Sequence, residues 1–178
     1  PLPFVHPSLS TLAQANDDVL VWLGHSSVFL KTDGLTFFVD PVFTTASPFP
    51  WMFSPFKGSN GFTIEEVPPI DVLIITHDHY DHLDYRTIKR LRQRVNRVVC
   101  PLGIGEHLER WGYPSDAITE LDWDESVLLD NQIQLHCLST QHFSGRFLHP
   151  GNTLWASFLL ESPSHKIFLS GDGGYDDR

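Results

Sequence analysis

Residues 71–84 read DVLIITHDHYDHLD, a short apolar run that ends abruptly in a segment rich in histidine and aspartate. An apolar run of this length predicts a strand that is buried on both faces, as in a parallel sheet. The following residues, 85–95, carry apolar side chains at helical spacing, and Asp84 suits the N-terminal capping position. This order places the polar loop at the carboxyl end of a buried strand, where open α/β sheets bind ligands.

Other apolar runs, rich in β-branched and aromatic residues, predict further strands on both sides of this segment. The Asp-Gly pair at residues 33–34 predicts a hairpin between two of them. A second, short helix is predicted over residues 103–111. The predicted strands are 19–24, 27–32, 35–40, 97–100, 133–139, 153–161 and 166–172.

Residues 41–70 form a long segment that shows neither a helical nor a strand period. The segment contains six prolines and six aromatic residues. Loops of this length are uncommon in compact domains and are usually functional or disordered, and the aromatic residues argue against disorder. Two interpretations remain: a loop packed flat over the sheet edge, or an apolar wall or lid beside a pocket that accepts acyl chains.

The composition limits the partners and the compartment. The 178 residues fit one domain, expected to span 1–178, and the formal net charge of −10 argues against nucleic acid as a partner. Cys100 and Cys137 form no CxxC pair, so both are expected to be buried free thiols. We therefore expect a cytoplasmic location. The chain starts at Pro1, which leaves a removed export signal as the alternative.

The polar loop has the spacing of a two-metal site. His77 and His79 are two residues apart and point the same way in an extended segment, so they can share one ion. Asp81 and His82 follow where the chain turns into the helix, and can serve a second ion about 3.5–4 Å away. Imidazole and carboxylate ligands suit zinc best, with iron and manganese as alternatives.

Two later positions supply further ligands. His142 follows the strand predicted at 133–139, and Asp172 ends the strand predicted at 166–172. Each is a polar residue after an apolar run, like the first cluster. Tyr80, between the ligand positions, either faces the substrate or packs within the fold.

The whole pattern resembles the metallo-β-lactamase superfamily, which implies an α+β fold, a four-layer αββα sandwich. The resemblance implies that Asp40, in FFVDPVF, supports the ligands from behind, and that His25 has a similar supporting role. A glutamate stands at the position of His79 in the flavodiiron members, so the histidine favours the hydrolytic, zinc-type branch. The implied metal ligands are His77, His79, Asp81, His82, His142 and Asp172.

Several segments narrow the resemblance to the family of N-acylphosphatidylethanolamine-hydrolysing phospholipase D and its bacterial relatives. They include WLGHSSVFL, DHYDHLDY, ELDW, LWAS and GDGGY, and they extend over residues 21–175. Gly173 departs from the family, which more often has Ser or Thr there. The superfamily also has a later histidine ligand that this chain lacks, so we expect a C-terminal part to be missing, or carried by a second chain.

The resemblance implies a binuclear zinc phosphodiesterase that acts on N-acylated phospholipids or related phosphodiesters, with peripheral membrane contact. His77, His79 and His142 would hold one ion, and the remaining ligands the other. Asp81 would orient the attacking water or accept its proton. The alternatives are a lactonase or thioesterase of the same fold, or a non-catalytic metal-binding protein, because fold and metals serve all of these.

Overall fold

Two β-sheets form the centre of the molecule. The computed structural model describes residues 5–44, 47, 62–146 and 149–175. The first sheet is mixed: β2 is antiparallel to its neighbours β1 and β3, and β3 to β6 run parallel. Its strands, in spatial and chain order, are β1 (Val19–Gly24), β2 (Ser27–Thr32), β3 (Leu35–Val39), β4 (Ile70–Ile74), β5 (Val95–Pro101) and β6 (Ile118–Leu121).

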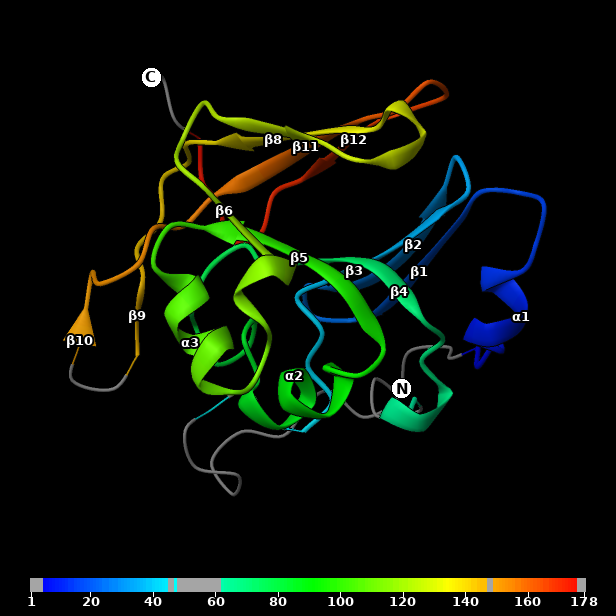
Figure 1. Cartoon of the computed structure of the whole chain (residues 1–178), viewed down its shortest axis with the longest axis horizontal. Helices are drawn as coiled ribbons and strands as arrows, with labels where there is room; N and C mark the ends of the chain where they lie inside the picture. The colour runs from blue at the N-terminus through cyan, green and yellow to red at the C-terminus, as the bar shows by residue number, and fades with distance from the viewer. Residues whose placement is uncertain (1–4, 45–46, 48–61, 147–148, 176–178) are drawn as a thin grey trace.

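The second sheet is antiparallel throughout, with the strand order β12-β11-β8-β7. A separate two-stranded hairpin, β9 with β10, projects beside α3 (Figure 1). The strands concerned are β7 (Ser126–Leu128), β8 (Gln134–Leu138), β9 (Gly145–Arg146), β10 (His149–Pro150), β11 (Ser157–Glu161) and β12 (Lys166–Leu169).

Helices cover the face of the first sheet that is turned away from the second sheet (Figure 1). The helices α2 (Tyr85–Leu91) and α3 (Ile104–Arg110) lie against that face, and α1 (Leu9–Ala13) packs at its edge. Short 3-10 helices lie at η2 (Ile64–Glu66), η3 (Ser115–Ala117) and η4 (Asp130–Gln132). The described residues thus form three layers in the order helix, sheet, sheet.

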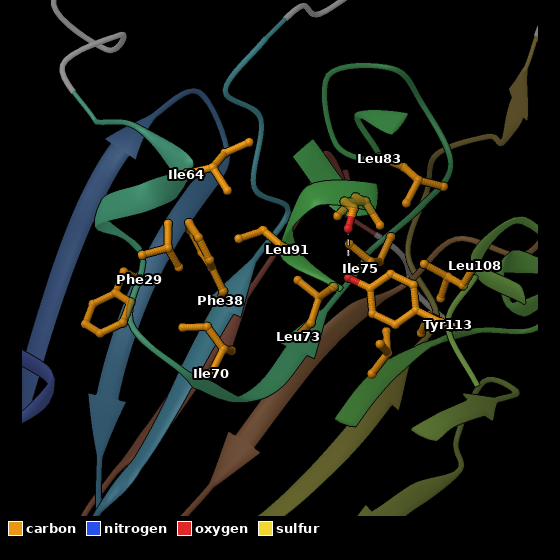
Figure 2. Close-up of a cluster of buried hydrophobic side chains, with 14 of the residues drawn as sticks. Phe29, Phe38, Ile64, Ile70, Leu73, Ile75, Leu83, Leu91, Leu108 and Tyr113 are labelled. Carbon is orange, nitrogen blue, oxygen red and sulfur yellow. Dashed lines mark hydrogen bonds between the residues drawn. The ribbon is translucent and has the colours of Figure 1, made fainter. Parts of the chain in front are cut away.

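Successive side chains along the strands of the first sheet point to opposite faces, and apolar side chains cover both faces. Phe38 and Leu73 point toward the helices and lie in one buried cluster with Leu91 and Leu108 (Figure 2). The hydroxyl of Tyr113 donates to the carbonyl of Ile88 at 2.9 Å, which gives this buried phenol a partner within the helical layer (Figure 2). This cluster holds α2 and α3 on the sheet.

The opposite face of the first sheet packs on the second sheet. Phe37 and Ile74 from the first sheet lie in one buried cluster with Leu135, Phe158 and Leu160 from the second. All five side chains are fully buried. Because β3 and β4 contribute to both clusters, they read as almost continuous apolar runs, as the sequence predicts for a central strand.

The predicted strands at 19–24 and 27–32 are confirmed without change. The predicted helix at 85–95 is wrong at its end, because α2 stops at Leu91 and β5 begins at Val95. Val95 fits the helical spacing, but it pairs with Ile70 in the parallel ladder. The tertiary pairing therefore ends the helix one turn early.

The predicted strand at 153–161 is also too long, since β11 covers only its second half. Before it, the Leu154 amide donates to the Leu102 carbonyl and the Ala156 amide to the Thr76 carbonyl. These bonds tie the segment to the first sheet instead of extending the second. The strands β6 and β7 were not predicted, because ITEL and SVL are short and partly polar.

The long loop predicted at 41–70 lies mostly outside the described residues. Its described part contains η2, where Thr63 and Glu66 form a capping box, so the segment is not wholly irregular. The predicted lid or acyl-chain wall falls on residues that the structure does not describe. Among the described residues, the longest helices have seven residues, and none is long and apolar enough to cross a membrane.

Candidate metal centre

The loop that follows β4 turns back on itself. Its first residues continue the strand, since the amide of Ile75 donates to the carbonyl of Val99 at 3.1 Å. The amides of His82 and Leu83 then both donate to the carbonyl of His79, at 3.1 and 2.8 Å. This turn separates the loop into an extended half, with His77 and His79, and a returning half, with Asp81 and His82.

Three imidazoles converge at the extended half. The Nε2 atom of His77 lies 2.9 Å from Nδ1 of His79, and Nε2 of His142 lies 3.2 Å from both of these nitrogens. Zinc–nitrogen bonds of about 2.0–2.1 Å at tetrahedral angles separate ligand nitrogens by about 3.3 Å. The three nitrogens therefore have nearly the spacing that one such ion requires.

Two of these imidazoles, those of His77 and His142, are kept neutral by their surroundings. Burial, together with the neighbouring His82 and His79, lowers the pKa of His77 to about 2. Burial and His79 also lower the pKa of His142. Neutral imidazoles present free lone pairs, which is the form that binds metal. Crowding three histidines is unfavourable for protons and favourable for a cation that accepts their lone pairs.

A second group forms at the returning half of the loop. The ligand atoms of His25, Asp81, His82 and Asp172 all lie within 4.8 Å of one another. The Nε2 atom of His25 is 2.9 Å from Oδ2 of Asp81, and Nε2 of His82 is 3.2 Å from Oδ1 of Asp172. The rings of His77 and His82, one from each group, are 4.0 Å apart between centroids, so the two groups are neighbours.

Asp40 holds His82 from behind. Its Oδ2 atom lies 2.7 Å from Nδ1 of His82, while its two oxygens accept hydrogen bonds from the amide and the hydroxyl of Thr76 at 2.8 and 2.6 Å. Asp40 and His82 are completely buried. With Nδ1 donating to this carboxylate, the ring of His82 is oriented so that Nε2 faces Asp172.

The carboxylates of the second group give it a negative charge that favours a bound cation. Burial disfavours the protonated form of His82, but Asp40 and Asp172 outweigh it and raise the pKa of His82 to about 10. The close approach of His82 holds the pKa of Asp172 well below its usual range. The Nε2 atom of His82 is buried and makes no hydrogen bond, since its 3.2 Å approach to Asp172 lacks the required direction. A metal ion fits this unsatisfied atom.

His25 reaches the second group from the turn between β1 and β2. It has a positive φ of 47°, and its carbonyl accepts a hydrogen bond from Nε1 of Trp22 at 2.7 Å. The hydrogen bond with Asp81 raises the pKa of His25, against burial and the charge of His82. The sequence predicts only a supporting role for His25. The structure also places its Nε2 at ligand distance, a proximity across 56 residues that periodicity does not reveal.

The backbone around Asp172 is fixed by close approaches. A Cβ atom at Gly173 would lie 2.0 Å from Oγ1 of Thr140, and one at Gly171 would lie 2.9 Å from Thr76. The amide of Gly174 donates to the carbonyl of Gln141 at 2.8 Å. Thr140 therefore leaves no space for a side chain at position 173, where this chain has glycine and the resembling family more often has Ser or Thr.

Two aromatic residues near the groups have different surroundings. The ring of Tyr80 lies 4.2 Å from the Arg146 guanidinium carbon, a contact that supports a packing role, and its substrate role stays a prediction. Phe143 was not predicted as a site residue. Its side chain is 65% exposed, and its ring lies 4.7 Å from that of His79. An exposed aromatic ring thus borders the histidine group.

Comparisons with known proteins identify the family and the fold of the chain. The family model described as "Beta-lactamase superfamily domain" matches residues 36–178. An uncharacterized protein of Mycobacterium tuberculosis is 38% identical over 98% of this chain and 47% of its own length. The N-acyl-phosphatidylethanolamine-hydrolyzing phospholipase D 1 of Caenorhabditis elegans is 31% identical over 88% of this chain and 47% of its own length. The chain therefore spans about half the length of these relatives.

A solved structure gives the same fold. The diiron β-hydroxylase CmlA of Streptomyces venezuelae superposes with a TM-score of 0.68 at 29% identity, over 90% of this chain and 30% of that one. The predicted metallo-β-lactamase-like fold class is confirmed, with the described residues forming part of that fold. Relatives that are named for hydrolysis and for hydroxylation share it, so the fold alone does not select a reaction.

Proposed function

Because the chain belongs to the beta-lactamase superfamily, we propose that it carries the metal centre of a metal-dependent hydrolase, a binuclear phosphodiesterase of phospholipase D type. The observation that carries this proposal is the pair of adjacent ligand groups, one of three imidazoles and one of mixed imidazole and carboxylate groups. Neighbouring two-ion sites of this kind suit hydrolysis of phosphodiesters.

In this proposal His77, His79 and His142 hold one ion, and Asp81, His82 and Asp172 hold the second. Two bound zinc ions would lower the pKa of a water molecule and offset the charge that develops on the phosphoryl oxygens. Asp40 and His25 orient these ligands, Asp40 through Nδ1 of His82 and His25 through Oδ2 of Asp81.

Asp81 has the environment of a group that orients or accepts a proton. Burial raises the pKa of Asp81, but the hydrogen bond from His25 and the charge of His82 together outweigh burial and lower this pKa overall. The carboxylate is therefore ionised at neutral pH. Its second oxygen makes no hydrogen bond with the described side chains, so it is free to face the second ion or the attacking water.

A lipid or smaller phosphodiester is the proposed substrate. The relative from C. elegans is named for hydrolysis of an N-acyl phospholipid, and the exposed ring of Phe143 beside His79 offers an apolar contact for an acyl chain. Zinc is the proposed metal because a group of three imidazoles suits it. The similarity to the diiron CmlA makes iron the second candidate.

The test is chelator-sensitive turnover of bis(p-nitrophenyl) phosphate by the full-length protein, with metal content measured by elemental analysis. We expect about two zinc ions per chain and loss of turnover after chelation, with recovery on adding zinc. The variant His142→Ala should lose one ion and most activity, whereas His165→Ala, an exposed residue that contacts Asp18, should lose neither.

Other results would assign the centre differently. Cleavage of lactones or thioesters without phosphodiester cleavage would favour a lactonase or thioesterase. Two iron ions with oxygen-dependent chemistry would favour the redox candidate, and bound metal without any turnover would favour a non-catalytic role. The variant Phe143→Ala should raise KM for a long-chain substrate while leaving turnover of bis(p-nitrophenyl) phosphate within about twofold, if this ring binds the acyl chain.

A further inference from the structure

A cavity borders the ligand loop at Asp78. It has a volume of about 360 Å³, within the range of small-molecule sites. Its walls come from α3, from β9 and from the residues that follow β10. The side chains that matter for its chemistry are Glu106, His107, Arg110, Arg146, Asn152 and Thr153. No member of the two ligand groups lines it.

Arg146 is the chemical centre of this cavity. Its side chain is half-buried, and its guanidinium carbon lies 4.2 Å from the ring centroid of Tyr80 and 5.6 Å from that of Trp111. Among the described residues, no carboxylate forms an ion pair with it. Asp78, which also lines the cavity, accepts instead from the amide of Gly145 at 2.7 Å. A half-buried cation that makes no direct ion pair is unfavourable even with the charges of Asp78 and Asp84 nearby, and a bound anion would reduce this cost.

One nitrogen of the Arg146 guanidinium is already hydrogen-bonded within the protein. Its Nη1 atom donates to the carbonyls of Asp78 and Leu83, each at 2.7 Å. The N–H groups on Nη2 and Nε have no hydrogen-bond partner among the described residues. Such adjacent N–H groups match the two oxygens of a carboxylate or a phosphate.

The surrounding side chains can complete such a site. The hydroxyl oxygen of Thr153 is buried and has no hydrogen-bond partner among the described residues, and the amide of Asn152 lies beside it in the lining. Arg110 is exposed and bonds Glu106 at 2.7 Å, so this pair contributes little stability and can open. A second cation and the side chain of Asn152 therefore lie around Arg146, and the buried Thr153 hydroxyl belongs to the same wall.

We propose that this cavity binds a small oxyanion, a carboxylate or phosphate group, on the free edge of the Arg146 guanidinium. The site is separate from the metal centre, because the side chain of Asp78 points toward β9 while the rings of its neighbours His77 and His79 meet His142. The proposal does not depend on the proposed reaction. It does affect the metal loop, since Arg146 holds the carbonyls at both ends of residues 78–83.

The test follows the NMR signal of the Arg146 side chain while an anion is added. Inorganic phosphate and acetate are titrated separately into ¹⁵N-labelled protein, and the arginine Nε–Hε signals are followed by NMR. We expect one arginine signal, the one missing in Arg146→Lys, to shift and saturate. A shift with phosphate alone would identify a phosphate group as the ligand, and a shift with acetate alone a carboxylate.

Variants locate the bound anion. Arg146→Lys should weaken binding about tenfold, because an ammonium group cannot form two parallel hydrogen bonds. Arg110→Lys, the matched change at the exposed rim, should weaken it about twofold or less. His142→Ala should leave it unchanged, which separates this cavity from the metal centre.

The proposal is overturned if no arginine signal of the wild-type protein shifts with either anion. It is also overturned if Arg146→Lys binds as tightly as the wild type, or if His142→Ala abolishes binding, since the anion would then occupy the histidine group. The wild-type titration decides the matter even if the Arg146 variant does not fold.

Discussion

Asp40 shows how much one buried residue determines at the candidate centre. It adopts a positive φ of 41°, a conformation that is unfavourable for residues other than glycine, asparagine and aspartate. The hydrogen bonds to Thr76 and His82 offset this strain. The sequence predicts the supporting role of Asp40 through family resemblance alone, because neither its backbone conformation nor its contact with His82, 42 residues away, follows from local pattern.

Replacing Asp40 by asparagine tests that support. Asparagine tolerates the positive φ and keeps one hydrogen-bond acceptor, so the variant should fold, but it removes the charge that orients His82. We expect zinc affinity at the second group to fall about 10–100-fold, measured by competition with a chromophoric chelator. An unchanged affinity would show that His82 does not bind metal or does not need Asp40. Asp71→Asn, a change of the same type at a carboxylate that bonds Thr36, is the control.

The raised pKa of His82 makes the stability of the metal-free protein depend on pH. Because the folded-state value of about 10 exceeds the ordinary value of 6.5, the contribution is complete below pH 6.5 and is lost as pH rises toward 10. The stability advantage of the wild type over Asp40→Asn should therefore shrink by a few kcal/mol between pH 6 and pH 10. Urea unfolding in the presence of chelator measures both proteins. A constant or growing advantage would contradict this assignment of the proton.

At the scale of elements, the sequence predicts best where local pattern and tertiary contacts agree. The strands β1 and β2 and the cap of α2 at Asp84 follow directly from apolar runs and capping preferences. The end of α2 does not, because the parallel pairing of β5 with β4 takes Val95 away from the helix. Neither the order of strands within a sheet nor the packing of one sheet on the other is encoded in such local signals.

Asp84 joins the ligand loop to α2, so replacing it should destabilise both segments. Its Oδ1 atom accepts from the amide of Arg86, and its Oδ2 atom accepts from the hydroxyls of Thr44 and Thr87. Asp84→Ala should lower the free energy of unfolding by about 2–3 kcal/mol, since it removes a cap and leaves buried donors unsatisfied. Asp84→Asn should lose less than half of this. Equal losses in urea unfolding would mean that charge, not hydrogen bonding, matters there.

At the scale of the whole molecule, the two candidate ligand groups connect the two sheets. His77 and His82 follow β4 of the first sheet, whereas His142 follows β8 and Asp172 follows β12 of the second. The sequence predicts which residues gather, because each lies just after an apolar strand. It does not predict that His25 would reach the second group, because that position depends on the turn after β1.

Metal binding should therefore stabilise the whole fold. Zinc that binds only the folded state at a hundredfold excess over Kd adds about 2.7 kcal/mol, which raises Tm by several degrees for a chain of this size. Differential scanning calorimetry with and without chelator measures the shift. His142→Ala should lose a large part of the shift and His165→Ala none of it. A shift that survives in both variants would place the metal elsewhere.

The separation of the ligand groups along the chain also bears on how the protein folds. The nitrogens of His77 and His142 meet across 65 residues, and those of His79 and His142 across 63. Contacts this distant in sequence form late, because a long loop must close first, whereas the hairpins β1–β2 and β11–β12 can form locally. The three-imidazole group is thus assembled only once both sheets have docked. Metal uptake would then report the last step of folding, because before the sheets dock only the ligands of the loop, His77, His79, Asp81 and His82, lie near one another.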